Sequence, residues 1–434
     1  MSGLKLKISF LSILYLIIFI GLSGCSKSTY SDSSAENSDY FKSEKSSLER
    51  AAPLASLEEM AGLSERNNDF AIRLYKKISD TEGNLVFSPY SISLAMAMLY
   101  AGAVGNTEKE ISSVFNFPIP QDELHPVFNS LDLALASRGR EAKGQDGEGF
   151  SLRIANQLFM QNGFSVLEQY LDKLALYYGT GVGLLDFENE PDESALAINR
   201  WIEDKTAGLI KNVIDRNSLE DIRLALVNTI YFNAAWDKIF NESLTDKRYF
   251  FPEGAPPVKV DMMRQQETFP CFIGDDYTAI ELPYDGKELS MLVIMPKASG
   301  MSEFEMNLST GIIDRIVDSL NPDRVALSLP RFKFSSGSID LKKILASMGM
   351  PEPFTEFADF SGITGIRQLK INDIIHKAFI DVNERGTKAA AVTVINAGVE
   401  SMPDEIYVNR PFIFIIRDIK THSILFMGRV SKPL

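Results

Sequence analysis

The chain has 434 residues, of which 45% are hydrophobic and 24% are charged, an ordinary globular composition with enough apolar material for a large core. The formal net charge is −14, and the Lys and Arg residues are scattered without a basic stripe that could follow a phosphate backbone, which argues against nucleic-acid binding. The two cysteines, Cys25 and Cys271, exclude a disulfide framework; they could pair with each other, but Cys271 alone is expected to be a small buried hydrophobe.

The first 25 residues are organised like an export signal. Two lysines precede an apolar run, residues 8–20, which is shorter than the roughly 20 residues of a membrane-spanning helix and has the length of a signal-peptide core. The sequence Leu22-Ser23-Gly24-Cys25 follows and resembles a lipobox, whose cysteine thiol takes a diacylglycerol. We therefore expect a signal peptide over residues 1–24 and an extracytoplasmic lipoprotein anchored to a membrane at Cys25. The alternatives are an ordinary cleaved signal, which gives a secreted protein, or an uncleaved anchor.

Residues 25–55 are rich in Ser and in charged side chains. A segment of this composition cannot bury enough apolar surface to fold by itself. We therefore predict a flexible tether that joins the membrane to a folded domain of residues 56–434.

From residue 56 onward the chain alternates helical and strand patterns without a strong linker or an internal repeat. Helices are expected over residues 56–79, 91–102 and 192–207 and from Thr107, where Glu110 completes a capping-box pattern, and strands over residues 151–160, 223–233 and 289–295. The last two strands are almost continuously apolar, as strands in the middle of a covered sheet are. The mixture, without βαβ regularity, predicts one large α+β domain.

The sequence lacks the signatures of catalytic and cofactor sites. The three histidines, His125, His376 and His422, belong to no HExxH pattern, and there is no CxxC, GxSxG or nucleotide-binding glycine loop. A Ser-His-Asp triad could be assembled from scattered residues, but nothing in the sequence supports one. We therefore expect a protein that is not an enzyme and needs neither a metal nor a cofactor.

Three segments carry a family resemblance. They are residues 84–103, which contain the turn Ser88-Pro89-Tyr90-Ser91, residues 226–236, and residues 376–391 together with 409–414 and 425–430. In this order they resemble the serpin family closely, over residues 56–434. The resemblance implies an α+β serpin fold with a large mixed β-sheet, smaller sheets, about nine helices and an exposed reactive-centre loop.

The residues that follow Gly386 have the composition of a strand. Residues 386–399 contain no proline and one charge, Lys388, and the alternate positions from Thr387 to Val399 are small or apolar, as a strand with one face in a packed sheet requires. Taken alone, the pattern fits an ordinary central strand with a polar turn after it. With the resemblance, it indicates a strand that is held outside the sheet and inserted later, a strand addition for which serpins are a recognised example.

The resemblance also implies a mechanism and a partner. A target serine protease, or a cysteine protease, attacks the exposed loop, forms an acyl-enzyme and is trapped when the cut loop inserts into the large sheet. Counting from Glu384 places the scissile bond between Glu400 and Ser401, which implies a glutamyl-specific protease. A shift by one residue would make Val399 the bait and imply an elastase-like target. The inhibitor is expected to be a monomer.

By the same resemblance, three groups of residues have expected roles. The hinge comprises Glu384, Gly386, Thr387, Ala389, Ala390 and Ala391. A shutter, a hydrogen-bonded cluster under the sheet opening, comprises Ser88, Ser91, Asn228 and His376, and a gate where the loop enters comprises Arg331, Glu384 and Trp236. The alternative for the shutter is four unrelated polar residues. The alternative for the gate is an isolated surface ion pair between Glu384 and Arg331.

Two rival functions remain open on the sequence. A non-inhibitory serpin would act as a carrier, chaperone or other binding module, although the small, proline-free hinge argues against it. A lipid-anchored hydrolase would instead depend on His376 as a general base.

Overall fold

The computed structural model describes residues 40–433 apart from 118, 141, 143–149, 220, 298–299, 338 and 388–402. The described residues belong to one compact unit, residues 34–434. The expected signal peptide, Cys25, Ala389, Ala390, Ala391, Glu400 and Ser401 lie outside the described residues.

Ten α-helices occur in the described part of the chain, one more than the nine expected. They are α1 (Leu57–Ile78), α2 (Pro89–Tyr100), α3 (Gly105–Phe115), α4 (Gln121–Ala136), α5 (Glu168–Tyr178), α6 (Pro191–Lys205), α7 (Gly300–Asn307), α8 (Thr310–Ser319), α9 (Leu341–Met348) and α10 (Ser361–Thr364). Helix α3 begins before Thr107, whose hydroxyl donates a hydrogen bond to Glu352 at 2.9 Å and does not cap the helix.

The strands of the described residues form two sheets. The seven-stranded sheet has the order β1 (Lys42–Glu44), β4 (Val182–Leu185), β3 (Ser151–Gln161), β5 (Leu224–Ala235), β13 (Gly386–Thr387), β12 (Asp373–Asn383) and β11 (Phe332–Ser335). The nine-stranded sheet has the order β14 (Asp404–Tyr407), β10 (Asn321–Pro330), β7 (Val258–Ile273), β8 (Tyr277–Pro283), β9 (Leu289–Pro296), β15 (Phe412–Asp418), β16 (Ile424–Val430) and β2 (Leu85–Phe87), with β6 (Asp246–Phe250) paired to β7. Both sheets contain parallel and antiparallel pairs, so the predicted α+β fold with large mixed sheets is confirmed.

Helix α2 lies in the core between the two sheets. All of its residues are buried, and it packs against β3 and β5 of one sheet and β16 of the other. Its start is fixed locally, because the Ser88 hydroxyl accepts a hydrogen bond from the Ser91 N–H at 3.2 Å and Pro89 occupies the first turn. The Ser-Pro-x-Ser turn therefore places Ser88 and Ser91 directly under the seven-stranded sheet.

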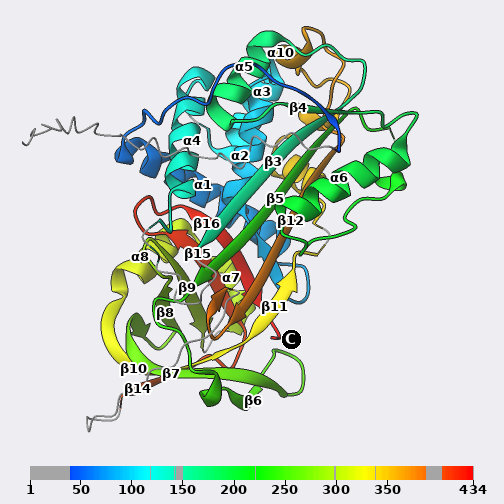
Figure 1. Ribbon diagram of the computed structural model, residues 1–434. Helices are drawn as coiled ribbons and strands as arrows, with labels where there is room; N and C mark the ends of the chain where they lie inside the picture. Colours follow the sequence, from blue (N-terminus) through cyan, green and yellow to red (C-terminus); the bar gives the residue numbers. More distant parts are fainter. Residues whose placement is uncertain are drawn as a thin grey trace, which may run out of the picture. The chain divides into compact units, whose positions relative to one another are not determined.

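Helix α6 lies across the other face of the seven-stranded sheet (Figure 1). Its Ile198 and Trp201 share a second, smaller core with Ala225 and Val227 of β5. Because helices cover both faces, every residue of β5 is buried, as its almost continuously apolar sequence predicts.

Residues 40–55, which we call the N-terminal strap, are folded against the domain. Strand β1 pairs with β4 at the edge of the seven-stranded sheet, and the Phe41 ring packs edge-on against Phe159 at 4.8 Å. Arg50 forms a largely buried ion pair with Asp132 of α4 at 2.7 Å and donates a hydrogen bond to Asn129 at 2.8 Å. The predicted flexible tether is therefore wrong for these residues, because edge pairing and a few long-range contacts compensate for their low apolar content.

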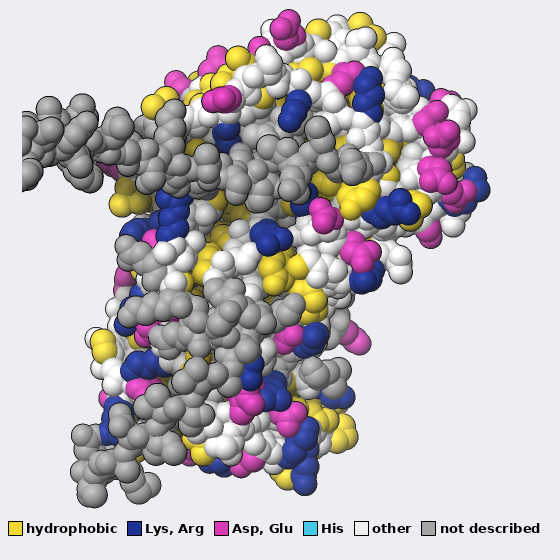
Figure 2. Space-filling model, in the orientation of Figure 1, with side chains coloured by type: hydrophobic (Ala, Val, Ile, Leu, Met, Phe, Trp, Pro, Cys, Tyr) yellow, Lys and Arg dark blue, Asp and Glu magenta, His cyan; other side chains and the backbone are white. Residues whose placement is uncertain are grey.

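Charged side chains of both signs are mixed on the face of the molecule that Figure 2 shows. On the face shown in Figure 2, the Lys and Arg side chains of the described residues are interspersed with Asp and Glu, and they form no continuous basic stripe on that face. Among the helices of the described residues, none combines the length and the apolar character needed to cross a membrane.

The contacts of Arg50 predict how firmly the strap is held. Arg50→Ala removes the Asp132 ion pair and should lower the opening free energy of the β1 and β4 amides by about 1–2 kcal/mol, because charged hydrogen bonds with little exposure are the strong ones. Native-state hydrogen exchange measures this directly. Lys42→Ala is the matched control, since Lys42 is largely exposed in its pair with Glu44 and should change these amides by under about 0.5 kcal/mol. Equal effects of the two substitutions would contradict the role of Arg50.

Candidate functional site

Strands β5 and β12 lie side by side along only part of their length. Residues Ala225–Ile230 of β5 pair in parallel with Asp373–Ala378 of β12, a contact that we call the seam. Beyond the seam the two strands separate, and β13 lies between them, antiparallel to both. We call this end of the sheet the hinge end. The opposite end, where β5 and β12 begin, is called the far end. The first two residues of the expected moving segment thus already hold a strand position.

Gly386 occupies a position that only glycine fits. Its φ is +147°, and a Cβ there would lie 2.1 Å from the carbonyl oxygen of Ala234. Thr387, its neighbour, is 2% exposed, and its hydroxyl lies 3.0 Å from the Tyr284 hydroxyl. The hinge positions Gly386 and Thr387 therefore lie inside the sheet, whereas the three hinge alanines fall outside the described residues.

Trp236 holds the turn that joins β12 to β13. Its ring stacks on Tyr284 with 4.6 Å between centroids. Its indole N–H donates to the Asn383 carbonyl at 3.0 Å, and its backbone N–H donates to the Arg385 carbonyl at 2.8 Å. Trp236 is therefore placed at the point where the chain leaves β12 and enters the sheet again.

The carboxylate of Glu384 lies at the same end and is 2% exposed. The Arg331 guanidinium binds both of its oxygens, with Nε 2.7 Å from each, and the Thr245 hydroxyl donates to Oε1. The Glu384 carbonyl also accepts from the Phe240 N–H at 2.7 Å. An isolated surface ion pair is thus excluded for Glu384 and Arg331, because the carboxylate is buried and has further partners.

Ser88, Ser91, Asn228 and His376 lie together under the seam. The His376 ring bonds to the Asn228 side-chain oxygen through Nδ1, and its Nε2 accepts from the Ser88 N–H at 3.1 Å. The Asn228 amide donates to the Ser91 carbonyl at 3.0 Å and to the Ser91 hydroxyl. The four residues form one hydrogen-bonded network, so the alternative of four unrelated polar residues does not fit the structure.

The network fixes the state of the His376 ring. Because Nε2 accepts from a backbone N–H, the proton of the neutral ring is on Nδ1, which donates to Asn228. Burial lowers the pKa of His376 to about 3, with a smaller contribution from Lys377. A hydrolase that uses His376 as a general base does not fit this arrangement, since the side chain is 4% exposed and both nitrogens are engaged.

Sequence reasoning missed one member of this network. Asn156 of β3 lies opposite Asn228 in the sheet register, and its side-chain oxygen accepts a hydrogen bond from the Asn228 amide. A polar amide inside the largely apolar strand of residues 151–160 was the available signal, because a buried amide needs a partner. Tyr284, which contacts both Thr387 and Trp236, was missed as well and carries no comparable signal in the sequence.

Comparison with known proteins agrees with this geometry. Residues 65–433 match the model of the family described as Serpin (serine protease inhibitor), and the chain belongs to the serpin family. It is 39% identical over 373 residues to an uncharacterized serpin-like protein of Thermococcus kodakarensis, covering 84% of each chain. Serpins are in general protease inhibitors rather than enzymes.

Two further relatives differ in what their names describe. The leukocyte elastase inhibitor of Xenopus laevis is 35% identical over 389 residues, covering 86% of this chain and all of the relative. The crystal structure of human thyroxine-binding globulin in complex with thyroxine superposes with a TM-score of 0.79 at 30% identity, covering 86% of this chain and 99% of that one. The names of these relatives therefore describe an elastase inhibitor in one case and a thyroxine-binding protein in the other.

The low pKa of His376 predicts how stability depends on pH. In the unfolded chain a histidine takes a proton near pH 6.5, whereas folded His376 stays neutral to about pH 3, and buried His125 behaves in the same way. Between these values the unfolded chain binds more protons, so the stabilisation present above pH 6.5 is lost as the pH falls. His125 and His376 should each contribute a slope of about 1.4 kcal/mol per pH unit to the unfolding free energy.

His376→Gln isolates the contribution of this ring. Urea unfolding between pH 5 and 6 should show the steep slope in the unchanged protein and about half of it in the variant, in which His125 still titrates. An unchanged slope would show that His376 is already protonated, or exposed, in the folded protein.

Proposed function

We propose that this protein is an extracytoplasmic inhibitor of serine proteases, with cysteine proteases as a second class of target. After cleavage, the inhibitor would trap its target by inserting residues 388–400 into the seam. One observation carries the proposal. In the seam, Ala225 of β5 faces Asp373 of β12, and the two residues are 148 positions apart in the sequence. At the hinge end, Gly386 lies between Ala235 of β5 and Asn383 of β12, which are also 148 positions apart. A new strand can therefore continue from β13 to the far end without β5 and β12 sliding past each other.

The chemistry at the loop is an acyl transfer that stops halfway. The hydroxyl oxygen of the protease serine bonds to the carbonyl carbon of Glu400, and the bond from that carbon to the Ser401 nitrogen breaks. The proton of the serine hydroxyl passes through the protease's base to the Ser401 nitrogen, which leaves as a new amino terminus. Insertion then carries the acylated protease to the far end before water can hydrolyse the ester.

The register also decides which side chains enter the core. Residues opposite one another in an antiparallel pair lie on the same face, and Leu226, Ile230 and Phe232 of β5 face the core around α2. Continuing from Gly386 opposite Ala235 puts the inward positions of the inserted strand opposite these residues. Those positions are Ala389, Ala391, Thr393, Ile395 and Ala397, all uncharged, and Lys388 falls on the other face. Thr393 would come between Asn228 and His376, where the buried network offers polar partners.

The target class rests on the residue before the scissile bond. With the bond at Glu400-Ser401, a glutamyl-specific protease is the expected partner; a shift by one residue presents Val399 and an elastase-like partner, the class named by the Xenopus relative. Neither residue is among those that the structure describes.

A second candidate function is a carrier or binding module without inhibition. The similarity to thyroxine-binding globulin favours it. The intact seam offset and the uncharged inward positions support the inhibitor, since a carrier does not need an insertable loop.

A protease panel tests the proposal. Incubation with glutamyl-specific and elastase-like proteases should give a covalent complex that survives SDS and whose mass is that of the protease plus the chain up to residue 400. Cleavage should also raise the melting temperature by more than about 10 °C, because one short parallel seam is replaced by two long antiparallel ladders. Cleavage with neither a covalent complex nor a rise in melting temperature would support the binding module.

Ala391→Arg is a variant that separates cleavage from trapping. In the register that continues from β13, residue 391 would come opposite Ile230 of β5 on the core side, so its guanidinium would have to be buried without a partner when the loop inserts. Insertion should therefore slow, and the protein should become a substrate that is cut and released. Ser243→Arg, which adds the same charge at an exposed position near the hinge end, is the control and should still trap the protease. Equal trapping by both variants would contradict the inward position of residue 391 in the inserted strand.

The location of the protein is part of the proposal and rests on Leu22-Ser23-Gly24-Cys25. A diacylglycerol on Cys25 would hold the folded domain at the outer side of a membrane through residues 26–39, which precede the strap. Expressed in a bacterium, the protein should sediment with membranes and incorporate labelled fatty acid, and Cys25→Ser should abolish both. A soluble, unlabelled parent protein would contradict the proposed lipid anchor but would leave the inhibitor proposal unaffected.

A further inference from the structure

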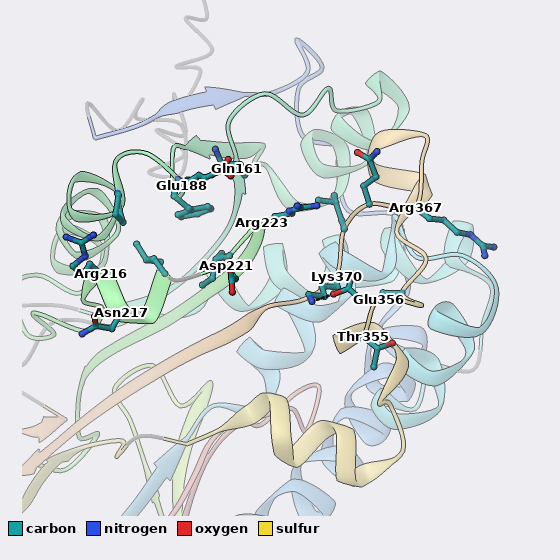
Figure 3. A pocket seen from close by; sticks show the side chains of 17 residues that line it. Gln161, Glu188, Arg216, Asn217, Asp221, Arg223, Thr355, Glu356, Arg367 and Lys370 are labelled. Carbon is teal, nitrogen blue, oxygen red and sulfur yellow. Dashed lines mark hydrogen bonds and ion pairs between the residues drawn. The ribbon is translucent and has the colours of Figure 1, made fainter.

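A polar pocket of about 710 Å³ lies at the far end of the seven-stranded sheet. It is lined by the chain segments that lead into the two seam strands, residues 221–223 before β5 and residues 367–370 before β12. Figure 3 shows these two segments meeting at the ends of the strands, with Arg223, Asp221, Lys370 and Glu356 grouped there and Arg216 on the far side beside α6. The pocket therefore continues the line of the seam beyond the end of the sheet.

The register of β13 says which residues would reach this pocket. Gly386 faces Ala235 and Asn383, so an inserted strand in the same register ends with Ala397 opposite Leu224, the first residue of β5. Gly398 would lie opposite Arg223, and two further residues, about 7 Å of extended chain, lead to Glu400. The residue at the proposed scissile bond thus arrives among the residues that line the pocket.

Among the residues that the structure describes, one cation that lines the pocket, Arg223, forms no ion pair. Arg216 and Arg367 are paired with Asp192 and Asp359, and Lys370 is paired with Glu356. Within the same described part of the chain, the Arg223 guanidinium makes no hydrogen bond or ion pair; it is near enough to Glu356 to help lower the pKa of that carboxylate, after the larger effect of Lys370. Glu188 and Asp221 also line the pocket, and neither lies within ion-pair distance of Arg223.

We propose that this pocket is a receiving site for the Glu400 side chain after loop insertion, with Arg223 as its partner. The inference rests on the proposed function and adds a role for the acidic residue after cleavage. While the loop is outside the sheet, the Glu400 carboxylate serves as bait for a basic protease pocket. Once the strand is inserted, Arg223 competes for the same carboxylate and draws it out of the protease, which favours the trapped state over return of the protease to productive binding.

The first test compares native and cleaved protein. A glutamyl-specific protease cuts the unchanged protein, Arg223→Ala and the control Arg216→Ala, which removes a cation that lines the same pocket but is already paired with Asp192. Arg223→Ala should lower the melting temperature of the cleaved form by about 1–3 °C and leave the native form unchanged, whereas Arg216→Ala should not distinguish the two forms. Equal melting temperatures of the cleaved Arg223→Ala variant and the cleaved parent protein would overturn the receiving site. In that case a rise in melting temperature of the parent on cleavage would still support loop insertion.

The second test does not depend on cleavage. Two synthetic peptides of residues 389–400 with an amidated terminus, one with the natural Glu400 and one with the substitution Glu400→Gln, are annealed to the uncut protein, and their dissociation is followed by fluorescence. The Glu peptide should dissociate about threefold to fivefold more slowly than the Gln peptide, and the ratio should fall to one in Arg223→Ala and at about 1 M salt. A ratio of one in the parent protein overturns the receiving site alone. Failure of both peptides to anneal, with no rise in melting temperature on cleavage, overturns the proposed function and this inference together.

Discussion

The parallel seam between β5 and β12 is the contact on which the rest of the structure depends. Parallel pairing is slightly less stable per residue than antiparallel pairing, and here it extends over only six residues of each strand. Beyond the seam, at the hinge end, β5 and β12 are already separated, because Gly386 and Thr387 occupy the space between them. The sheet is therefore held closed by a short, weak ladder and held open at one end by the first two residues of the segment that would fill it.

The buried polar groups under the seam could keep hydrogen-bond partners both when the sheet is closed and when it opens. The cluster of Ser88, Ser91, Asn228 and His376 is buried, so each member needs a partner in any state of the sheet. Separation of the strands would break the hydrogen bond between His376 and Asn228. In the proposed inserted strand, the Thr393 hydroxyl would lie between the two side chains and could replace that hydrogen bond. At the hinge end, the buried carboxylate of Glu384 attaches the turn between β12 and β13 to Arg331.

Much of the fold follows from patterns that the sequence displays openly. The almost continuously apolar stretches became β5 and β9, the mainly apolar stretch after Pro89 became α2, and their burial agrees with this composition. The pairing of His376 with Asn228 did not follow, because it depends on a parallel contact between strands that are 148 residues apart in the sequence. Only the resemblance to a family brought those residues together in advance.

The failures of prediction have equally specific causes. The strap was taken for a tether because its composition is polar, but β1 needs only a free sheet edge, and Arg50 needs only Asp132, to be held in place. Asn156 was overlooked because an amide in a strand carries little information until its partner is known. The pocket at the far end could not be foreseen, since Arg223 and Lys370 belong to different segments whose approach is set by the offset of the two seam strands.

A crystal structure of the protein after cleavage of its loop tests the central claim most directly. The account predicts a continuous strand of residues 386–397 between β5 and β12, with Thr393 opposite Asn228 and His376 and the two older strands about 9.5 Å apart along the former seam. A cleaved protein whose seam still pairs Ala225 with Asp373, or whose new strand is shifted by one residue so that Lys388 enters the core, would contradict it.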